Sequence, residues 1–570
     1  MDVQSRDRSN VSEMQDSIIS PEEEEDVITC GDAIEACGFG KFQIGLSIFA
    51  GLLWMVDAME IMVLAILAPT VRCTFHLTSL QEGLFGTMVF GGMAIGAGLW
   101  GKFMDMYGRK KGIFVFCVFV AVTSLASAFA PNYVSLVVLR TAVGFGISGG
   151  AQAVTFYLEF LPAKSRAYCL VFLELFFCCG TFLEVLLAMI LMGHFKLSWH
   201  WLLGFSAVPM FIDLLAFVLV PESAHYHMAC NETDKAMEVL KRVARINNKE
   251  LPRGRLVSQS EKARIQEKAR IQVNAKTPKI LGKGEKQLQL SLNTSGNVEE
   301  WEDPVMPETN PLIGPQKQKS DSHGIGRGHV TELFSTRLRG MTTLLLWIIW
   351  FGAAFSYYGI VLFTTEMLTI IQQRENNSDI VPCISSAHSH SSSANSTCQL
   401  LNIADYEQLL WTTAAEFPGV ILTVLIIERI GRKRTMIVEF LLAVSCFFLM
   451  YICPIHRTVL LLFIFGARGA LTGAFQTAIV YTPEFYPTNI RALGTGICNS
   501  ISRVGAMVTP FVAEVLLRAS VRGGEGSYAA ACLICTVCAL LLPVETKGRE
   551  LDDASDKRLP AESKTAEVES

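Results

Sequence analysis

The chain alternates long apolar runs with short polar connections along most of its length. Runs of about 20 apolar residues match the length that a helix needs to cross a hydrocarbon core of about 30 Å. Because lipid offers backbone groups no hydrogen-bond partner, each run must be a helix. The pattern predicts an all-α polytopic membrane protein with twelve spans, at 43–69, 83–103, 112–130, 133–158, 168–192, 200–220, 341–363, 408–427, 435–453, 458–481, 493–517 and 527–543.

The polar segments between these runs divide the chain into five parts. We predict an N-terminal tail (1–42), a six-helix bundle (43–220), a long loop (221–340), a second six-helix bundle (341–543) and a C-terminal tail (544–570). The loop opens with "DKAMEVLKRVARINN", which has helical periodicity, and within 254–330 it takes on a composition typical of disorder. The first 40 residues are polar and include "PEEEED", so no cleavable signal peptide is expected.

Composition and charge agree with this organisation. Hydrophobic residues make up 51% of the chain and charged residues 18%, which no ordinary water-soluble domain matches. The short loops after spans 2, 4, 8 and 10 hold eleven Lys and Arg, against six in the loops on the opposite side. The positive-inside rule therefore predicts that both termini are cytoplasmic.

The two predicted bundles repeat one another. "DMYGRKK" (105–111) recurs as "ERIGRKR" (428–434), and "EFLPAKSRA" (159–167) recurs as "EFYPTNIRA" (484–492). An acid beside a Gly-Arg-Lys turn can form charge-assisted bonds that break and re-form, as a cytoplasmic gate requires. The alternative is that these cations only set topology. The candidate gate residues are Asp105, Gly108, Arg109, Glu159, Arg166, Glu428, Gly431, Arg432, Glu484 and Arg491.

Charged residues inside the spans are functional hypotheses, because burying a charge in a membrane is expensive. Asp57 and Glu60 lie three residues apart in span 1 and so share one helix face. A buried acid can bind and release a proton near neutral pH; alternatively, these acids pair permanently with an arginine such as Arg140. Arg503, in span 11, would attract anions to a central cavity unless an acid neutralises it.

Further candidates for substrate contact or proton coupling lie in spans 1, 5 and 7. Repeat-related spans meet at central sites in carriers, which favours aromatic residues of spans 1 and 7, although most membrane aromatics serve packing. These additional candidates are Glu174, Glu184, Tyr357, Tyr358 and Trp54.

Several of these motifs resemble a known family. "GKFMDMYGRKK" (101–111) and its repeat resemble the loop signature of the major facilitator superfamily, and "PES" (221–223) and "PVETKGREL" (543–551) resemble its sugar-porter and organic-ion branch. "AIEACGFGKFQ", "DAMEIMVLAILAP", "FSYYG" and "EFPGV" are similar to the synaptic-vesicle-two-related, SVOP-like proteins. The resemblance covers all twelve spans. "PESAHYH" departs from the usual P-E-S-P-R ending, which predicts a weaker contact there.

The resemblance implies a twelve-helix carrier that works by alternating access. Organic-anion members carry an arginine in "SR-x-G" surroundings like those of Arg503, which favours an organic anion as substrate. We expect a monomeric secondary active transporter of a small organic solute, driven by protons, in the plasma membrane or an intracellular vesicle. The alternative is a non-transporting membrane protein that keeps the carrier fold as a binding component. No nucleic-acid partner, cofactor or enzyme activity is expected, since no such motif is present.

The loops carry three further candidates. The sequons predict glycosylation of Asn376 and Asn395, and Cys383 with Cys398 either form a disulfide or remain free thiols. An acidic dileucine pattern predicts a sorting adaptor as a partner, although such short patterns are common in disordered segments; its residues are Glu308, Leu312 and Ile313. "CLICTVC" (532–538) lies within span 12 without completing ligands, so no metal site is expected.

Overall fold

The computed structural model describes residues 27–258, 330–375, 401–452 and 457–547, with isolated positions 261–262, 264–265 and 268. Within these residues, twelve helical segments are long and apolar enough to cross a membrane, which confirms the predicted all-α fold class. The candidate glycosylation, sorting and loop-cysteine positions lie outside the described residues. They are Asn376, Asn395, Glu308, Leu312, Ile313, Cys383 and Cys398.

The first six spans are built from eight α-helices with short 3₁₀ or π segments. In chain order they are α3 (Lys41–Phe75), α4 (Ser79–Tyr107), α5 (Arg109–Ser127), α6 (Tyr133–Ile147), α7 (Gly150–Leu158), η1 (Ala163–Ser165), α8 (Arg166–Ala188), η2 (Met189–His194), α9 (Trp199–Ser206), α10 (Val208–Ala216) and η3 (Phe217–Leu219). We call this set the N-half.

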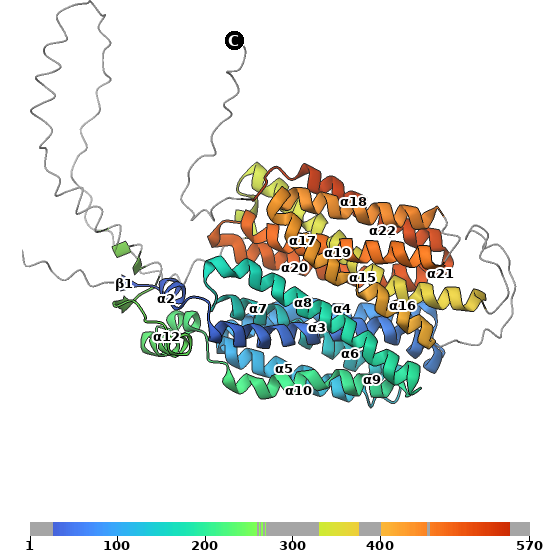
Figure 1. Ribbon diagram of the computed structural model, residues 1–570, viewed down its shortest axis with the longest axis horizontal. Helices are drawn as coiled ribbons and strands as arrows, with labels where there is room; N and C mark the ends of the chain where they lie inside the picture. The colour runs from blue at the N-terminus through green and yellow to red at the C-terminus, as the bar shows by residue number, and fades with distance from the viewer. Residues whose placement is uncertain are drawn as a thin grey trace, which may run out of the picture. The chain divides into compact units, whose positions relative to one another are not determined.

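The last six spans form the C-half. Its elements are α15 (Arg337–Glu375), α16 (Ile403–Thr413), α17 (Glu416–Ile430), α18 (Arg432–Tyr451), α19 (Arg457–Phe485), α20 (Thr488–Pro510), η5 (Phe511–Leu516), α21 (Leu517–Ala519) and α22 (Val521–Leu541). In Figure 1 the blue-to-green helices of the N-half lie beside the yellow-to-red helices of the C-half. Helices α4 and α20 pack along this boundary, as do α8 with α16 and α17.

An even number of spans returns the chain to the side where it started. We call the side where α3 begins and α22 ends the terminal side, and the opposite side the distal side. Helices α3 and α15 therefore run from the terminal to the distal side, and α4 and α17 run back. Residues near the middle of these helices lie at mid-depth.

Several spans differ from the uniform helices that hydropathy predicts. The first and seventh helices are longer than their apolar runs, since turns continue beyond the hydrocarbon. Span 4 divides between α6 and α7 near Ser148 and Gly149, and span 8 divides at Ala414 and Ala415. Span 11 changes to a π-helix after Pro510, whose ring cannot donate a backbone hydrogen bond. The breaks in spans 8 and 11 lie in helices that pack against the other half.

Between the halves, the loop holds α11 (Ala224–Ala229) and α12 (Thr233–Asn247), and η4 (Val330–Phe334) precedes α15. Helix α12 occupies the segment whose periodicity predicted a helix, and it buries Leu240 and Val243 on one face. Helix α2 (Cys30–Cys37) precedes α3. A separate small unit includes strands β1 (Val27–Ile28) and β2 (Arg255–Leu256), which pair in parallel.

One cysteine of the described residues is marked by a disulfide bond. Cys73, at the distal end of α3, is disulfide-bonded. The distal side thus carries an oxidised cysteine, a state typical of extracellular or luminal compartments.

Candidate transport site between the two halves

A buried ion pair lies inside the N-half. Arg140 Nη1 of α6 lies 2.7 Å from Glu60 Oε2 of α3, and both side chains are fully buried. Arg140 Nη2 also donates to the Glu60 backbone carbonyl (3.2 Å), and the Ser124 hydroxyl donates to the Glu60 carboxylate. The Ser206 hydroxyl contacts both oxygens of nearby Glu184 (2.7 and 2.8 Å). The permanent pairing considered from sequence therefore describes Glu60.

The C-half contains a second buried ion pair. Arg468 Nη2 of α19 lies 2.9 Å from Glu416 Oε1 of α17, and both side chains are again fully buried. The Tyr357 hydroxyl donates to the same carboxylate (3.3 Å). Thr181, from α8 of the N-half, donates to Glu416 Oε2 (2.7 Å) and so joins the halves. Arg140 and Arg468 hold matching positions, yet they pair with glutamates from non-equivalent spans, 1 and 8.

The remaining central charges, Asp57 and Arg503, are arranged differently. Asp57 of α3 and Arg503 of α20 interact electrostatically, but no ion pair joins them among the described residues. Arg503 Nη1 donates to the Tyr358 hydroxyl (3.2 Å) and lies 3.9 Å from Met93 Sδ of α4. Asp57 Oδ1 and Arg503 Nε are buried without any hydrogen-bond partner in the described structure. This arrangement leaves an acceptor and a donor available at the boundary of the halves.

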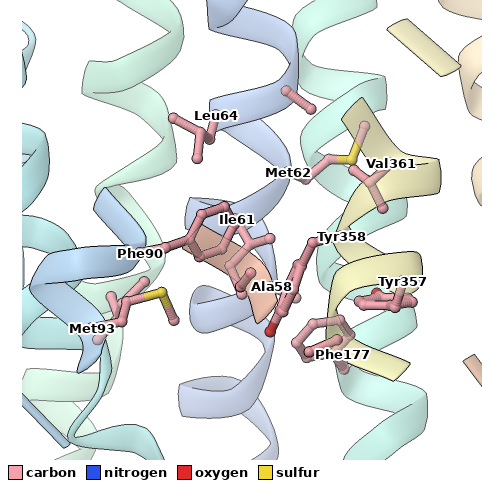
Figure 2. Packing of buried hydrophobic residues seen from close by; sticks show 14 of the residues in the cluster. Ala58, Ile61, Met62, Leu64, Phe90, Met93, Phe177, Tyr357, Tyr358 and Val361 are labelled. Carbon is pink, nitrogen blue, oxygen red and sulfur yellow. The ribbon is translucent and has the colours of Figure 1, made fainter. Parts of the chain in front are cut away.

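Aromatic side chains surround this point. Trp54 contacts Phe177, which contacts Tyr357, with ring centroids 6.0 and 6.4 Å apart. Tyr358 contacts Tyr357 (5.2 Å) and Phe90 of α4 (5.0 Å). Figure 2 shows Tyr358 extending from α15 towards α3, with Tyr357, Phe177 and Phe90 nearby. These rings give the central region apolar walls built from both halves.

Glu174 of α8 joins the edge of this region. Its carboxyl group interacts with the Trp54 side chain, and both residues are partly exposed. Of the sequence candidates, Asp57, Arg503, Tyr358, Trp54 and Glu174 therefore gather at the centre. Tyr357 joins the Glu416 pair next to it, whereas Glu60 and Glu184 lie within the N-half.

Contacts that join the halves occur at mid-depth and towards the distal side. On the distal side of α4, the Thr87 hydroxyl donates to the Met507 carbonyl of α20 (2.9 Å). A Cβ atom at Gly86 would lie 2.9 Å from the Pro510 ring, so glycine permits this close approach. The halves are thus tightly closed on the distal side.

At the terminal side, the candidate gate residues of the N-half pair with one another. Arg109 lies 3.0 Å from Asp105 and 3.5 Å from Glu159. Burial raises the pKa of the Glu159 carboxyl group above its ordinary value, while hydrogen bonding from Ser223 and the charge of Arg109 oppose the rise. Arg166 Nε donates to the Leu161 carbonyl (3.2 Å).

The C-half repeats this arrangement closely. Arg432 lies 3.0 Å from Glu428 and 3.1 Å from Glu484. Arg491 Nε donates to the Tyr486 carbonyl (3.2 Å), as Arg166 does to its own carbonyl. In each half, these ion pairs join residues of the same half, so they stabilise each half separately.

Two acids that sequence reasoning did not select complete these networks. Glu222 accepts from the Lys110 backbone N–H (2.9 Å), and Glu545 accepts from those of Arg432 and Lys433 (2.8 and 3.1 Å). Carboxylates are favoured at helix N-termini, where free N–H groups converge. Glu222 follows Gly108 by 114 residues, and Glu545 follows Gly431 by the same interval. This equal spacing of the "PES" and "PVET" motifs from the two turns could have identified both acids from the sequence.

The two glycines of these turns are required by geometry. Gly108 has φ +106° and Gly431 has φ +94°, which L side chains rarely adopt. A Cβ at either position would also lie 2.6 Å from the facing carboxyl group, that of Glu222 or Glu545. The Glu222 contact therefore forms despite the altered "PESAHYH" ending.

Two six-helix repeats with central polar groups define a membrane transporter architecture, and comparisons with known proteins agree. The family model for sugar and other transporters matches residues 36–290, and that of the major facilitator superfamily matches residues 408–567. The synaptic vesicle 2-related protein of Xenopus laevis is 39% identical over 549 residues, covering 96% of this chain and 87% of its own.

A plant relative and a solved structure extend the comparison. Organic cation/carnitine transporter 7 of Arabidopsis thaliana is 34% identical over 535 residues, covering 92% of this chain and 96% of its own. The inward-open xylose transporter XylE of E. coli has the same fold, with a TM-score of 0.60, 13% identity and coverage of 89% and 98%. The chain belongs to the major facilitator superfamily, as an SVOP-like transporter of the synaptic vesicle 2-related group.

Proposed function

We propose that this transporter moves a small organic solute by alternating access, with the solute bound at mid-depth between the halves. The observation that carries the proposal is the contrast between Asp57 and the paired glutamates. Glu60 and Glu416 each face a fully buried arginine. Asp57 and Arg503 instead form no ion pair among the described residues, and Asp57 Oδ1 and Arg503 Nε have no hydrogen-bond partner there. Buried polar atoms without partners are rare, and binding of a solute or proton would satisfy them.

Asp57 is the proposed coupling residue. As a carboxylate it bears a charge in a largely apolar interior, so binding a proton lowers the cost of burying it. When one side opens to water, the ionised form becomes favourable and the proton leaves. An ion gradient would thereby drive the cycle. We further propose Glu174, at the edge of the same region, as a solute contact, and Glu60 and Glu184 as residues that support the N-half.

Arg503 is the proposed anchor for an anionic group. Its guanidinium holds one hydrogen bond with Tyr358 and retains an unpartnered Nε. A guanidinium favours carboxylates, which accept two parallel hydrogen bonds. The aromatic residues Trp54, Tyr357 and Tyr358 would contact the apolar part of the solute. We therefore favour organic anions over organic cations or sugars.

The terminal-side networks are the proposed cytoplasmic gate. Asp105, Arg109 and Glu159 brace the N-half, and Glu428, Arg432 and Glu484 brace the C-half. Moderately exposed ion pairs cost little to rearrange, so they suit a surface that opens and closes in every cycle. Gly108, Gly431, Arg166 and Arg491 would hold the turns on which these pairs are built.

We infer an orientation with both termini in the cytoplasm. The charge bias of the loops favours it, and the disulfide-bonded Cys73 supports an oxidising distal side. The plasma membrane and intracellular vesicles both meet this requirement. A monomer, distal glycosylation and recognition of the loop by a sorting adaptor remain predictions from the sequence.

Uptake into proteoliposomes tests the proposal. A panel of radiolabelled carboxylates, amines and sugars would be offered with and without an inward proton gradient. We expect gradient-stimulated uptake of carboxylates, lost in Asp57→Asn. Arg503→Gln should weaken carboxylate binding by about tenfold to a hundredfold, the worth of one charged hydrogen bond. The exposed-residue controls Glu407→Gln and Arg434→Gln should behave as the unmodified protein.

Two other outcomes would contradict parts of the proposal. Uptake of amines but not carboxylates would overturn the preference for anions. If no solute moves and Asp57→Asn changes nothing, the non-transporting alternative is favoured.

A further inference from the structure

A second charged cluster lies away from the central region, at the distal ends of the helices. It contains three carboxyl groups and two guanidinium groups, and its carboxyl groups are almost fully buried. The residues, which we call the distal cluster, are Arg72 of α3, Glu82 of α4, Glu366 of α15, Glu514 of η5 and Arg518 of α21. Both halves contribute to it.

Arg518 joins the two halves within this cluster. It forms an ion pair with Glu82 of the N-half at 3.1 Å, and its Nη2 donates to Glu366 of the C-half at 2.8 Å. Arg72 lies 3.8 Å from Glu82. The two arginines thus neutralise two of the acids, Glu82 and Glu366. The ion pair between Arg518 and Glu82 must break if the halves separate on this side.

Glu514 is the third acid, and the cations leave it unpaired. Its side chain is buried, with 2% of the residue exposed, and neither carboxyl oxygen has a hydrogen-bond partner in the described structure. The charges of Glu82, Glu366 and Arg72 act on it. Three ionised carboxylates against two guanidinium groups would leave one uncompensated buried negative charge.

The surrounding elements add no further cation to this balance among the described residues. The other titratable groups that interact with Glu514 are Tyr133 of α6 and Tyr528 of α22, both neutral at physiological pH. Glu525, also on α22, instead interacts with Arg522. A neutral carboxyl group is far less costly to bury than a carboxylate, so the closed cluster favours a bound proton on Glu514.

The packing beside Glu514 links this group to distal closure. A Cβ at Gly83 of α4 would lie 3.3 Å from Phe511 and 3.6 Å from Val515, both in the π-helix that carries Glu514. Separation of α4 from η5 would remove this cover and admit water. An ionised Glu514 would then be solvated and would repel Glu82 and Glu366.

We propose that Glu514 is a proton-binding site of the distal gate, which takes up a proton as the two halves close on the distal side and releases it as they open. The inference rests on the alternating-access function proposed above. It adds a proton site distinct from Asp57, at a position where the proton is exchanged with the distal compartment. Acidity on that side would hold the distal gate shut.

Hydrogen–deuterium exchange of the full-length protein in lipid nanodiscs tests the proposal without requiring a known solute. The segments 77–90 and 507–520 report distal opening. Between about pH 6 and about pH 8, after correction for the intrinsic pH dependence of exchange, their exchange should rise on the order of tenfold or more. Each pH unit above the midpoint changes a one-proton equilibrium about tenfold.

Variants separate Glu514 from other groups. Glu514→Gln mimics the protonated form and should exchange slowly at both pH values, whereas Glu514→Asp should retain the pH response. Glu525→Gln is the matched control and should respond as the unmodified protein does. Arg518→Gln should raise distal exchange at both pH values, because the cation between Glu82 and Glu366 is lost.

A pH response in Glu514→Gln equal to that of the unmodified protein, or no response in the unmodified protein, would overturn the proposal. Asp57→Asn should keep the distal response. Absence of proton-driven uptake by the unmodified protein, with an intact distal response, would count against the proposed transport function alone. Proton-driven uptake without a distal response would count against Glu514 alone.

Discussion

The Glu60–Arg140 pair should contribute to stability far more than Asp57 does. Both members are fully buried, 2.7 Å apart, and come from α3 and α6. Glu60→Gln keeps the shape of the side chain but leaves Arg140 as an uncompensated buried cation. Removing one partner of such a pair costs about 3–5 kcal/mol. The acid of nearby Glu184 offsets part of that charge, so we expect about 3 kcal/mol.

A double-mutant cycle isolates the pairwise part of this cost. Glu60→Gln, Arg140→Gln and the double variant would be compared by equilibrium unfolding in mixed detergent micelles. The double variant has no unpaired charge, so its loss should fall below the sum of the single losses by about 1–3 kcal/mol. Asp57→Asn, which breaks no ion pair, is the matched control and should change stability by less than about 1 kcal/mol.

Two results would refute this reasoning. Glu60→Gln as stable as the unmodified protein would mean that the buried pair contributes little. Additive losses in the double variant would mean that the two side chains act independently despite their contact.

Three other predictions follow from local geometry. Gly86→Val should push the facing proline ring away and raise exchange in segments 77–90 and 507–520, since its Cβ would lie 2.9 Å from that ring. Gly108→Ala should introduce backbone strain of about 1–3 kcal/mol and so lower the yield of folded protein in size-exclusion chromatography. Gly98→Ala should leave that yield unchanged, because the space around Gly98 is open. Burial raises the folded-state pKa of Glu159, so acidification from neutral pH towards the ordinary glutamate value, about 4.3, should stabilise the N-half. Glu159→Gln should flatten that pH dependence in thermal unfolding, and an unchanged slope would contradict the assignment.

Hydropathy and repetition were sufficient to predict the twelve spans and the two halves. Both depend on local properties: the length of apolar runs and the recurrence of a motif. The same recurrence predicted which acids lie beside Arg109 and Arg432, because those pairs form over short distances at helix ends.

Long-range partners could not be predicted in this way. Arg140 and Arg468 occupy matching positions, but one pairs with span 1 and the other with span 8. Only the packed structure selects between such partners. Glu514 lies inside the span predicted at 493–517 and Arg518 follows that span directly, but the apolar pattern indicates no partner for either residue. Their importance depends on Glu82, more than 400 residues earlier in the chain.

The central claim is that Asp57 carries a proton with each solute bound beside Arg503. The most direct test is proton flux driven by a solute gradient in weakly buffered proteoliposomes that contain a pH-sensitive dye. The unmodified protein should move protons when a transported carboxylate is added, and Asp57→Asn should exchange the solute across the membrane without moving protons. Equal proton flux in Asp57→Asn and the unmodified protein would contradict the account.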